Sequence, residues 1–131
     1  MKTFVDRLRK RWDDWVGDHE MEQQIRRGLI GEGYSGNTAK ITAVRLVAVQ
    51  RPGWVQVFRF DVLARVKPAD PHEDMPDPEP EYHTLFGLIR DDARGQQTQV
   101  RFFRDEAQRR ELFGRWSDGL ICTRGGRQME S

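Results

Sequence analysis

The segment from Trp54 to Lys67, WVQVFRFDVLARVK, alternates between apolar and polar side chains over most of its length. Successive side chains of a β-strand point to opposite faces of the sheet, so this two-residue period predicts a strand with one apolar and one polar face. The apolar face would carry Phe58, Phe60, Val62, Ala64 and Val66. The polar face would carry Arg59, Asp61 and Arg65. A sheet with one buried face and one more polar face is typical of antiparallel arrangements.

Three other segments have the composition of strands. They are rich in β-branched or aromatic residues and are bounded by turn-forming residues. These segments are Lys40–Arg51, Tyr82–Arg90 and Thr98–Arg104. Residues 51–53 (RPG) supply a turn before the second strand, and residues 91–97 (DDARGQQ) supply a hairpin loop before the fourth. The sequence therefore predicts four antiparallel strands.

Two helices are predicted on either side of these strands. Apolar residues return at three- and four-residue steps over residues 3–29, which predicts a long amphipathic helix. We expect this helix, with Trp12 and Trp15, to cover the apolar face of the sheet. A short C-terminal helix should begin at Asp105 and end before Gly119. The expected fold class is α+β, with a long N-terminal helix packed on a four-stranded antiparallel sheet.

The order of these elements resembles the cystatin-like and NTF2-like architecture, in which a long helix packs across a curved antiparallel sheet. The resemblance lies in element order alone, without a shared residue motif. A chain of 131 residues is long enough for one domain, which we place at residues 1–121. Residues 122–131 have no pattern and are expected to form a frayed tail.

The composition argues against several protein classes. No apolar run approaches the roughly 20 residues of a membrane-spanning helix, and the basic N-terminus lacks the apolar stretch of a secretory signal. Cys122 is the only cysteine, which favours a reducing, cytoplasmic location over a disulfide-stabilised fold. The net charge of +1 argues against a dedicated nucleic-acid-binding protein.

Residues 67–81 (KPADPHEDMPDPEPE) combine five prolines with six carboxylates. Proline cannot donate to a β-ladder and the carboxylates repel one another, so this segment is predicted to be an exposed loop. Its carboxylates and His72 are possible ligands for a hard cation, but the glycine and the spacing of an EF-hand loop are absent. We expect no metal site. A solvated flap is the preferred interpretation, and a contact segment for a basic partner surface is the alternative.

The glycines of residues 31–36, GEGYSG, fit the G-x-G-x-x-G spacing of phosphate-binding loops. In a dinucleotide-binding fold such a loop follows a strand and precedes a helix, whereas here the predicted order is reversed. The preceding helix would also turn its carbonyl end toward the loop, which disfavours phosphate. We predict a corner between helix and strand.

A cavity between the helix and the sheet would be the place for a small-molecule site. The residues that could line it are Trp15, His19, Tyr82 and His83. Histidine titrates near neutral pH, so acid–base chemistry is the reaction class that such a site would support. Asp61, however, is predicted to point to the other face, and no nucleophile motif is present. We expect no cofactor.

The polar face of the sheet is the second candidate site, as an interface or an anion-binding surface. Its candidate residues are Arg59, Arg65, Arg101 and Phe103. Arginine and aromatic side chains are enriched in protein interfaces, and self-complementary surfaces make twofold dimers. The favoured function is therefore a non-catalytic interaction module that forms a homodimer, or binds another protein, through its sheet. The alternatives are a cone-shaped small-molecule-binding domain and an RNA- or anion-binding sheet.

Overall fold

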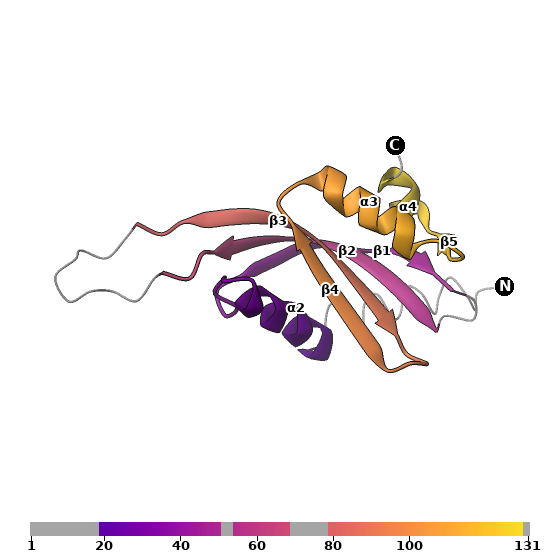
Figure 1. The fold of residues 1–131 in the computed structure, drawn as a ribbon, viewed down its shortest axis with the longest axis horizontal. Coiled ribbons are helices and arrows are strands. Elements are labelled where there is room, and N and C mark those ends of the chain that lie inside the picture. The colour runs from indigo at the N-terminus through magenta and orange to yellow at the C-terminus, as the bar shows by residue number, and fades with distance from the viewer. Residues whose placement is uncertain (1–18, 51–53, 69–78, 130–131) are drawn as a thin grey trace.

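The computed structural model of the chain describes residues 19–50, 54–68 and 79–129, and its centre is a five-stranded antiparallel sheet (Figure 1). The strands follow the order β4-β3-β2-β1-β5 across the sheet. Their bounds are β1 Lys40–Val49, β2 Val55–Arg65, β3 Tyr82–Asp92, β4 Gln97–Phe103 and β5 Ile121–Cys122. The four longer strands lie where the sequence predicts them, so an α+β fold with an antiparallel sheet is confirmed. The fifth strand is an addition.

Strand β2 has the predicted alternation and pairs with β1 on one side and β3 on the other. Its buried face carries Phe58, Phe60, Val62 and Ala64. Helix α2 (His19–Gly31) covers this face through Met21, Ile25 and Leu29, which belong to the same core cluster. Full burial of a leucine, isoleucine or phenylalanine side chain contributes about 1.5–3 kcal/mol, so these contacts hold the helix on the sheet.

The predicted long N-terminal helix is confirmed only in its last part. Helix α2 begins at His19 and has 13 residues, and predicted helical residues 3–18, with Trp12 and Trp15, lie outside the described residues. Gly28 lets this helix approach β4, because an added Cβ would lie 2.8 Å from the Phe102 ring. Among the helices that are described, none is both long and apolar enough to cross a membrane.

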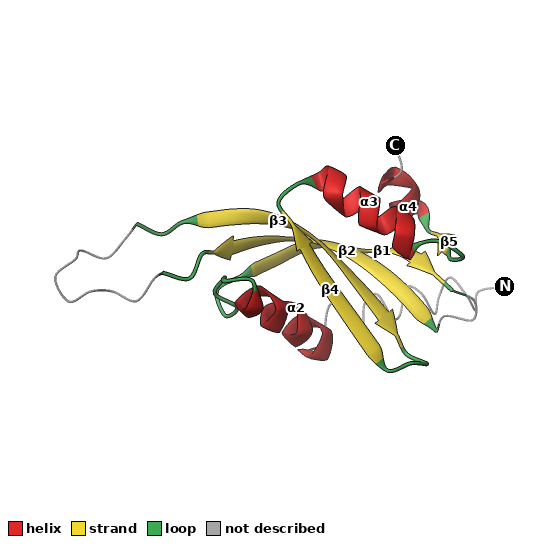
Figure 2. Ribbon diagram, in the orientation of Figure 1, coloured by secondary structure: helices red, strands yellow, loops and turns green. Residues whose placement is uncertain are grey.

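The opposite face of the sheet is covered too, by α3 (Glu106–Trp116) and α4 (Arg124–Met129) (Figure 2). Phe113 of α3 packs with Val57 and Leu88 in a second core cluster. The expectation that only one face would be covered is therefore wrong. The sequence did not indicate this because charged residues occupy alternate positions of β2, and one of them, Asp61, is paired with Arg109 of α3.

Helix α3 begins as predicted. Asp105 has an extended backbone, and its side chain accepts a hydrogen bond from the Ala107 N–H at 2.8 Å. Ser117 is the C-cap, and Gly119 beyond it has a φ of 76°. Glycine adopts this left-handed conformation at little cost, so it suits the position where the chain leaves a helix.

The C-terminal residues carry regular structure where the sequence predicts a frayed tail over residues 122–131. Strand β5 pairs with Ala48–Val49 of β1, and α4 follows directly. Gly126 lies so close to β1 that an added Cβ would be 2.1 Å from the Val47 carbonyl oxygen. A two-residue strand is too short to show a period, and the glycines that indicated flexibility instead allow close packing.

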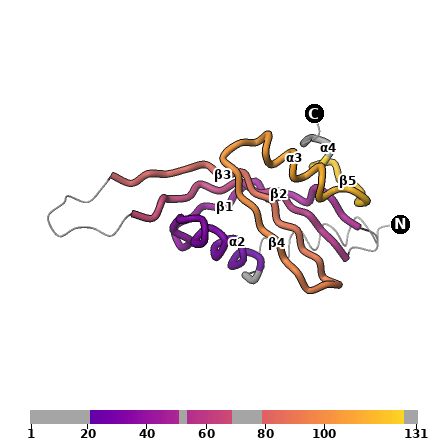
Figure 3. Tube along the Cα trace, in the orientation of Figure 1, coloured from indigo at the N-terminus to yellow at the C-terminus, as the bar shows by residue number. Residues whose placement is uncertain are grey.

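The two edges of the sheet are built differently. On the β1 side, the register shifts between Thr42 and Arg45 and again before Ala48, and Ala43 has a φ of 52°. Strand β5 and helix α4 lie against the remainder of that edge. Strand β4, at the other margin (Figure 3), pairs with β3 in unbroken register from Gln97 to Phe103. No further strand lies beside β4 within residues 19–50, 54–68 and 79–129, so β4 is an open, regular edge.

Candidate functional site

Three segments meet at the end of the sheet where β2 leaves it. The loop after α2 runs antiparallel to the end of β2, with Tyr34 opposite Val66 in an isolated β-bridge. The Ser35 N–H donates to the Arg65 carbonyl at 2.9 Å, and the Lys67 N–H donates to the Gly33 carbonyl at 2.9 Å. The start of β3 lies on the other side of β2. Side chains separated by about thirty positions are thus brought together.

The glycines of this loop have structural roles. Gly33 has a φ of 90°, which glycine tolerates and other residues do not. Gly36 is buried against α2, where an added Cβ would lie 2.9 Å from the Arg26 carbonyl oxygen. Arg26 Nη1 donates to the carbonyls of Gly36 and Ala39, at 2.6 Å and 3.0 Å. The predicted corner between helix and strand is confirmed.

Substitution of Gly36 by alanine is expected to lower the free energy of unfolding by about 1–3 kcal/mol, because the new methyl group must displace the Arg26 carbonyl or the Ile30 side chain. Gly31→Ala is the matched control, since nothing lies within 4 Å of its added Cβ. That change should be neutral or stabilise the protein by up to about 1 kcal/mol. Urea unfolding followed by circular dichroism measures both, and equal effects would contradict the packing described.

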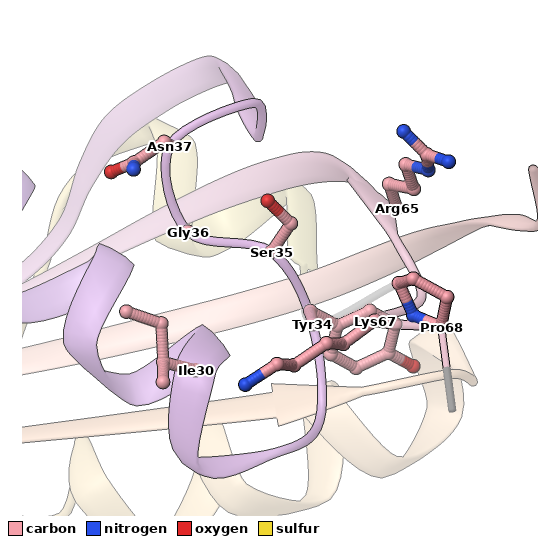
Figure 4. Close-up of a pocket in the computed structure, with 8 residues that line it drawn as sticks. All are labelled: Ile30, Tyr34, Ser35, Gly36, Asn37, Arg65, Lys67 and Pro68. Carbon is pink, nitrogen blue, oxygen red and sulfur yellow. The ribbon is translucent and has the colours of Figure 1, made fainter. Parts of the chain in front are cut away.

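A pocket of about 310 Å³ lies between this loop and the end of β2 (Figure 4). Its polar lining comes from Ser35, Asn37, Arg65 and Lys67. In Figure 4 the Lys67 side chain crosses Tyr34 toward Ile30, while Arg65 lies on the other side of Ser35. A second depression of about 220 Å³ also has Arg65 and Lys67 in its wall and adds Glu79 and Glu81.

His83 joins three segments beside this pocket. Its Nδ1 lies 2.8 Å from the Tyr34 hydroxyl and 2.8 Å from Arg104 Nη1. The single lone pair of Nδ1 accepts from the Tyr34 hydroxyl, and Arg104 Nη1, which is also 3.4 Å from Nε2, stays in contact with the ring. Nε2 then carries the proton and donates to Glu81 Oε1 at 2.9 Å. Both ring nitrogens are occupied in connecting the loop, β3 and the residues after β4.

The residues predicted to line a helix–sheet cavity are not brought together where they are described. Trp15 lies outside the described residues, and only the backbone of His19 is described. Tyr82 and His83 are consecutive in β3 and therefore point to opposite faces, and Tyr82 is exposed. The space between α2 and the sheet is instead filled by apolar side chains of the first core cluster, including Ile25, Leu29, Phe58 and Phe60.

The residues predicted for the polar face do share one face of the sheet. Arg59 and Arg101 both pair with Leu88 of β3, one from each side. Arg59 is half-buried with its Nη2 3.5 Å from Asp61 Oδ2, whereas Arg101 is exposed on the edge strand. Phe103 is half-buried on β4, and Arg65 lines the pocket already described. Leu88 is buried against Phe113 of α3, so Arg59 and Arg101 on either side of it do not form one open surface.

Arg109 of α3 is the polar residue that the sequence did not indicate. It is 1% exposed and donates to the Phe60 carbonyl at 3.0 Å and to Asp61 Oδ1 at 2.8 Å. Its other terminal nitrogen contacts Glu106, and its guanidinium lies 5.0 Å from the centre of the Phe86 ring. The i,i+3 spacing of Glu106 and Arg109 is visible in the sequence, but nothing there indicates that the pair enters the core.

Most of the acidic, proline-rich segment lies outside the described residues, so the predictions for it remain predictions. Comparison of the chain with known protein families, with curated proteins and with solved structures found no match. The geometry of the described residues is therefore the basis for the function proposed below.

Proposed function

We propose that the protein is a non-catalytic interaction module that associates with a second copy of itself through strand β4. The observation that supports this proposal is the contrast between the two edges of the sheet. An open edge presents a row of unpaired backbone N–H and C=O groups, and it is a ready template for another strand. The β1 edge is interrupted and covered, whereas β4 is regular and open among the described residues.

Natural proteins usually block an open edge with proline, a bulge, several charges or a covering element. Strand β4, QTQVRFF, has no proline and no register shift, and Arg101 is its only charged residue. Its seven residues are long enough for a stable strand pair. These properties suit a strand that pairs with a partner better than one that must stay unpaired.

The sequence of β4 is compatible with antiparallel pairing to its own copy. Full overlap of Gln97–Phe103 with the same strand centres the twofold axis on Val100. In that register Arg101 faces Gln99 of the second copy, and the two aromatic residues face Thr98 and Gln97. No like charges are opposed. A register centred on Arg101 would instead place two guanidinium groups directly opposite each other, which is destabilising.

The polar clusters support a non-catalytic role for the described residues. His83 uses both ring nitrogens to connect segments, and Arg109 connects α3 to β2. A general base needs a nitrogen or oxygen within reach of a substrate proton. The alternative of an open RNA-binding face loses support as well, because α3 packs over the central part of that face.

Charge substitutions at Gln99 test the proposal. Gln99→Lys places a lysine opposite Arg101 twice in each dimer and is expected to raise the dimer dissociation constant about two- to thirtyfold. Gln99→Glu places a carboxylate there and should lower the constant. Gln23→Lys on the exposed side of α2 adds the same charge away from β4 and is the control. Sedimentation equilibrium gives the constants, and a monomeric wild-type protein or equal effects of both Gln99 variants would contradict the proposal.

A further inference from the structure

The pocket beside the α2–β1 loop has a one-sided charge. Among the eight residues that line it, Arg65 and Lys67 are cationic and none is acidic. The whole chain, in contrast, has 22 basic and 21 acidic residues. The lining itself is therefore cationic, while Glu79 and Glu81 lie in the neighbouring depression that shares Arg65 and Lys67.

The two cations lack carboxylate partners among the described residues. Arg26, Arg59 and Arg109 each lie within 4 Å of a carboxylate oxygen. Neither Arg65 nor Lys67 has an ion pair within that part of the chain. The Nε atom of Arg65 is buried and has no hydrogen-bond acceptor. The Nε atoms of Arg59 and Arg109 have no acceptor either, so it is the unpaired charge of Arg65, and not this buried atom, that would attract an anion to the pocket.

The loop that forms the other wall is held in place. Arg26 binds two of its carbonyl groups, and the backbone of Ser35 is bonded to that of Arg65. The Thr38 hydroxyl donates to Ser35 Oγ at 3.1 Å, which leaves the Ser35 hydroxyl hydrogen available to donate into the pocket. Asn37 of the same loop also lines the pocket. Because the backbone of this loop is already ordered, it loses little conformational entropy when a ligand binds.

The pocket also has an apolar part, made by Ile30, the Tyr34 ring and Pro68. Ile30 is 54% exposed, which is high for an isoleucine. A volume of about 310 Å³ suits a small organic molecule better than a bare ion. We propose that this pocket binds a small organic oxyanion, with an apolar body against Ile30 and Tyr34 and its phosphate or carboxylate group bound by Lys67, Ser35 and Arg65.

This ligand site is independent of the proposed self-association. The pocket is formed by the loop after α2 and the end of β2, whereas the pairing edge lies on the far side of β3. The binding mode also differs from that of a nucleotide-binding glycine loop, because side chains supply the charge and the loop glycines serve the backbone turn. Loss of dimerisation would therefore leave ligand binding intact, and the reverse holds.

Titration of the full chain with phenyl phosphate, benzoate and inorganic phosphate at fixed ionic strength tests the site. We expect saturable ¹⁵N NMR shifts at Ser35–Asn37 and Lys67, with phenyl phosphate binding more tightly than inorganic phosphate because of the apolar wall. Preference for phenyl phosphate or for benzoate identifies the oxyanion, and either preference supports the proposal. Lys67→Gln should weaken binding about tenfold, as expected for the loss of one charge-assisted hydrogen bond.

Lys40→Gln is the matched control, because Lys40 is an exposed cation at the start of β1 that does not line the pocket. It should leave the dissociation constant unchanged. Ser35→Ala should weaken binding with little change in charge, and it decides the result if Lys67→Gln proves unstable. Absence of saturable binding for all three probes, or equal weakening by Lys40→Gln and Lys67→Gln, would overturn the proposal.

Discussion

Arg109→Ala is expected to lower the free energy of unfolding by about 3–5 kcal/mol, the range for removing one partner of a buried charge pair. The guanidinium of Arg109 bonds α3 to the backbone and to a side chain of β2. Without it, the Phe60 carbonyl loses a donor and the Asp61 carboxylate loses its closest cation. The space left beside Phe86 adds a cavity penalty.

Two further variants separate charge from volume at this position. Arg110→Ala removes the neighbouring arginine, which is 47% exposed and 3.8 Å from Glu106, and should change stability by no more than about 0.5 kcal/mol. Arg109→Leu keeps apolar volume and should cost less than alanine, because Asp61 and Glu106 are both partly exposed and can be hydrated. Urea unfolding measures all three. A loss below about 1 kcal/mol for Arg109→Ala would mean that α3 is held by its apolar contacts alone.

Gly87→Ala is expected to cost about 3 kcal/mol, at the upper end for overpacked cores. An added Cβ at this position would lie 2.2 Å from two carbon atoms of the Phe60 ring. Phe60 is fully buried and also makes an edge-to-face contact with Phe102, with ring centres 5.8 Å apart. Burial and this contact restrict how far the ring can move away from a new methyl group. Gly114→Ala, in the last turn of α3 with open space around it, should instead stabilise the protein by up to about 1 kcal/mol.

A double-mutant cycle attributes the cost to that single contact. Phe60→Leu shortens the side chain and should itself destabilise the protein, but it leaves room for a methyl group at Gly87. The combined variant should therefore be more stable than the sum of the two single effects, with a coupling of about 0.5–3 kcal/mol. Additive effects in thermal and urea unfolding would place the strain elsewhere.

The strands could be predicted from the sequence because successive side chains of a strand point to opposite faces of the sheet, so that apolar and polar residues alternate along it. The period of β2 identified Phe58, Phe60 and the other buried positions on one face, and the turn residues placed the hairpins. The start of α3 could also be predicted, because the capping hydrogen bond joins Asp105 to Ala107, only two residues further along the chain. These features depend on residues close together in the sequence.

The features that could not be predicted depend on residues far apart. The packing of α3 on the second face depends on the hydrogen bond between Arg109 and Asp61, which are 48 positions apart. Nothing in the sequence indicates that a charged residue such as Arg109 is buried. The packing of α4 requires Gly126 to meet Val47. The pocket likewise forms only when the loop at Ser35 lies beside the end of β2 at Arg65. The periodicity of one segment does not indicate which distant residues of the chain it will contact.

The unequal edges of the sheet also bear on the size of any assembly that β4 forms. Within the described part of the chain, a strand added to β4 would use the one open edge, because the irregular register near Ala43 and the packing of α4 obstruct the other. Growth would therefore stop at two molecules, whereas a sheet open on both sides could propagate into a filament. If molecules pair through β4 as proposed, the distorted β1 margin would keep their association finite.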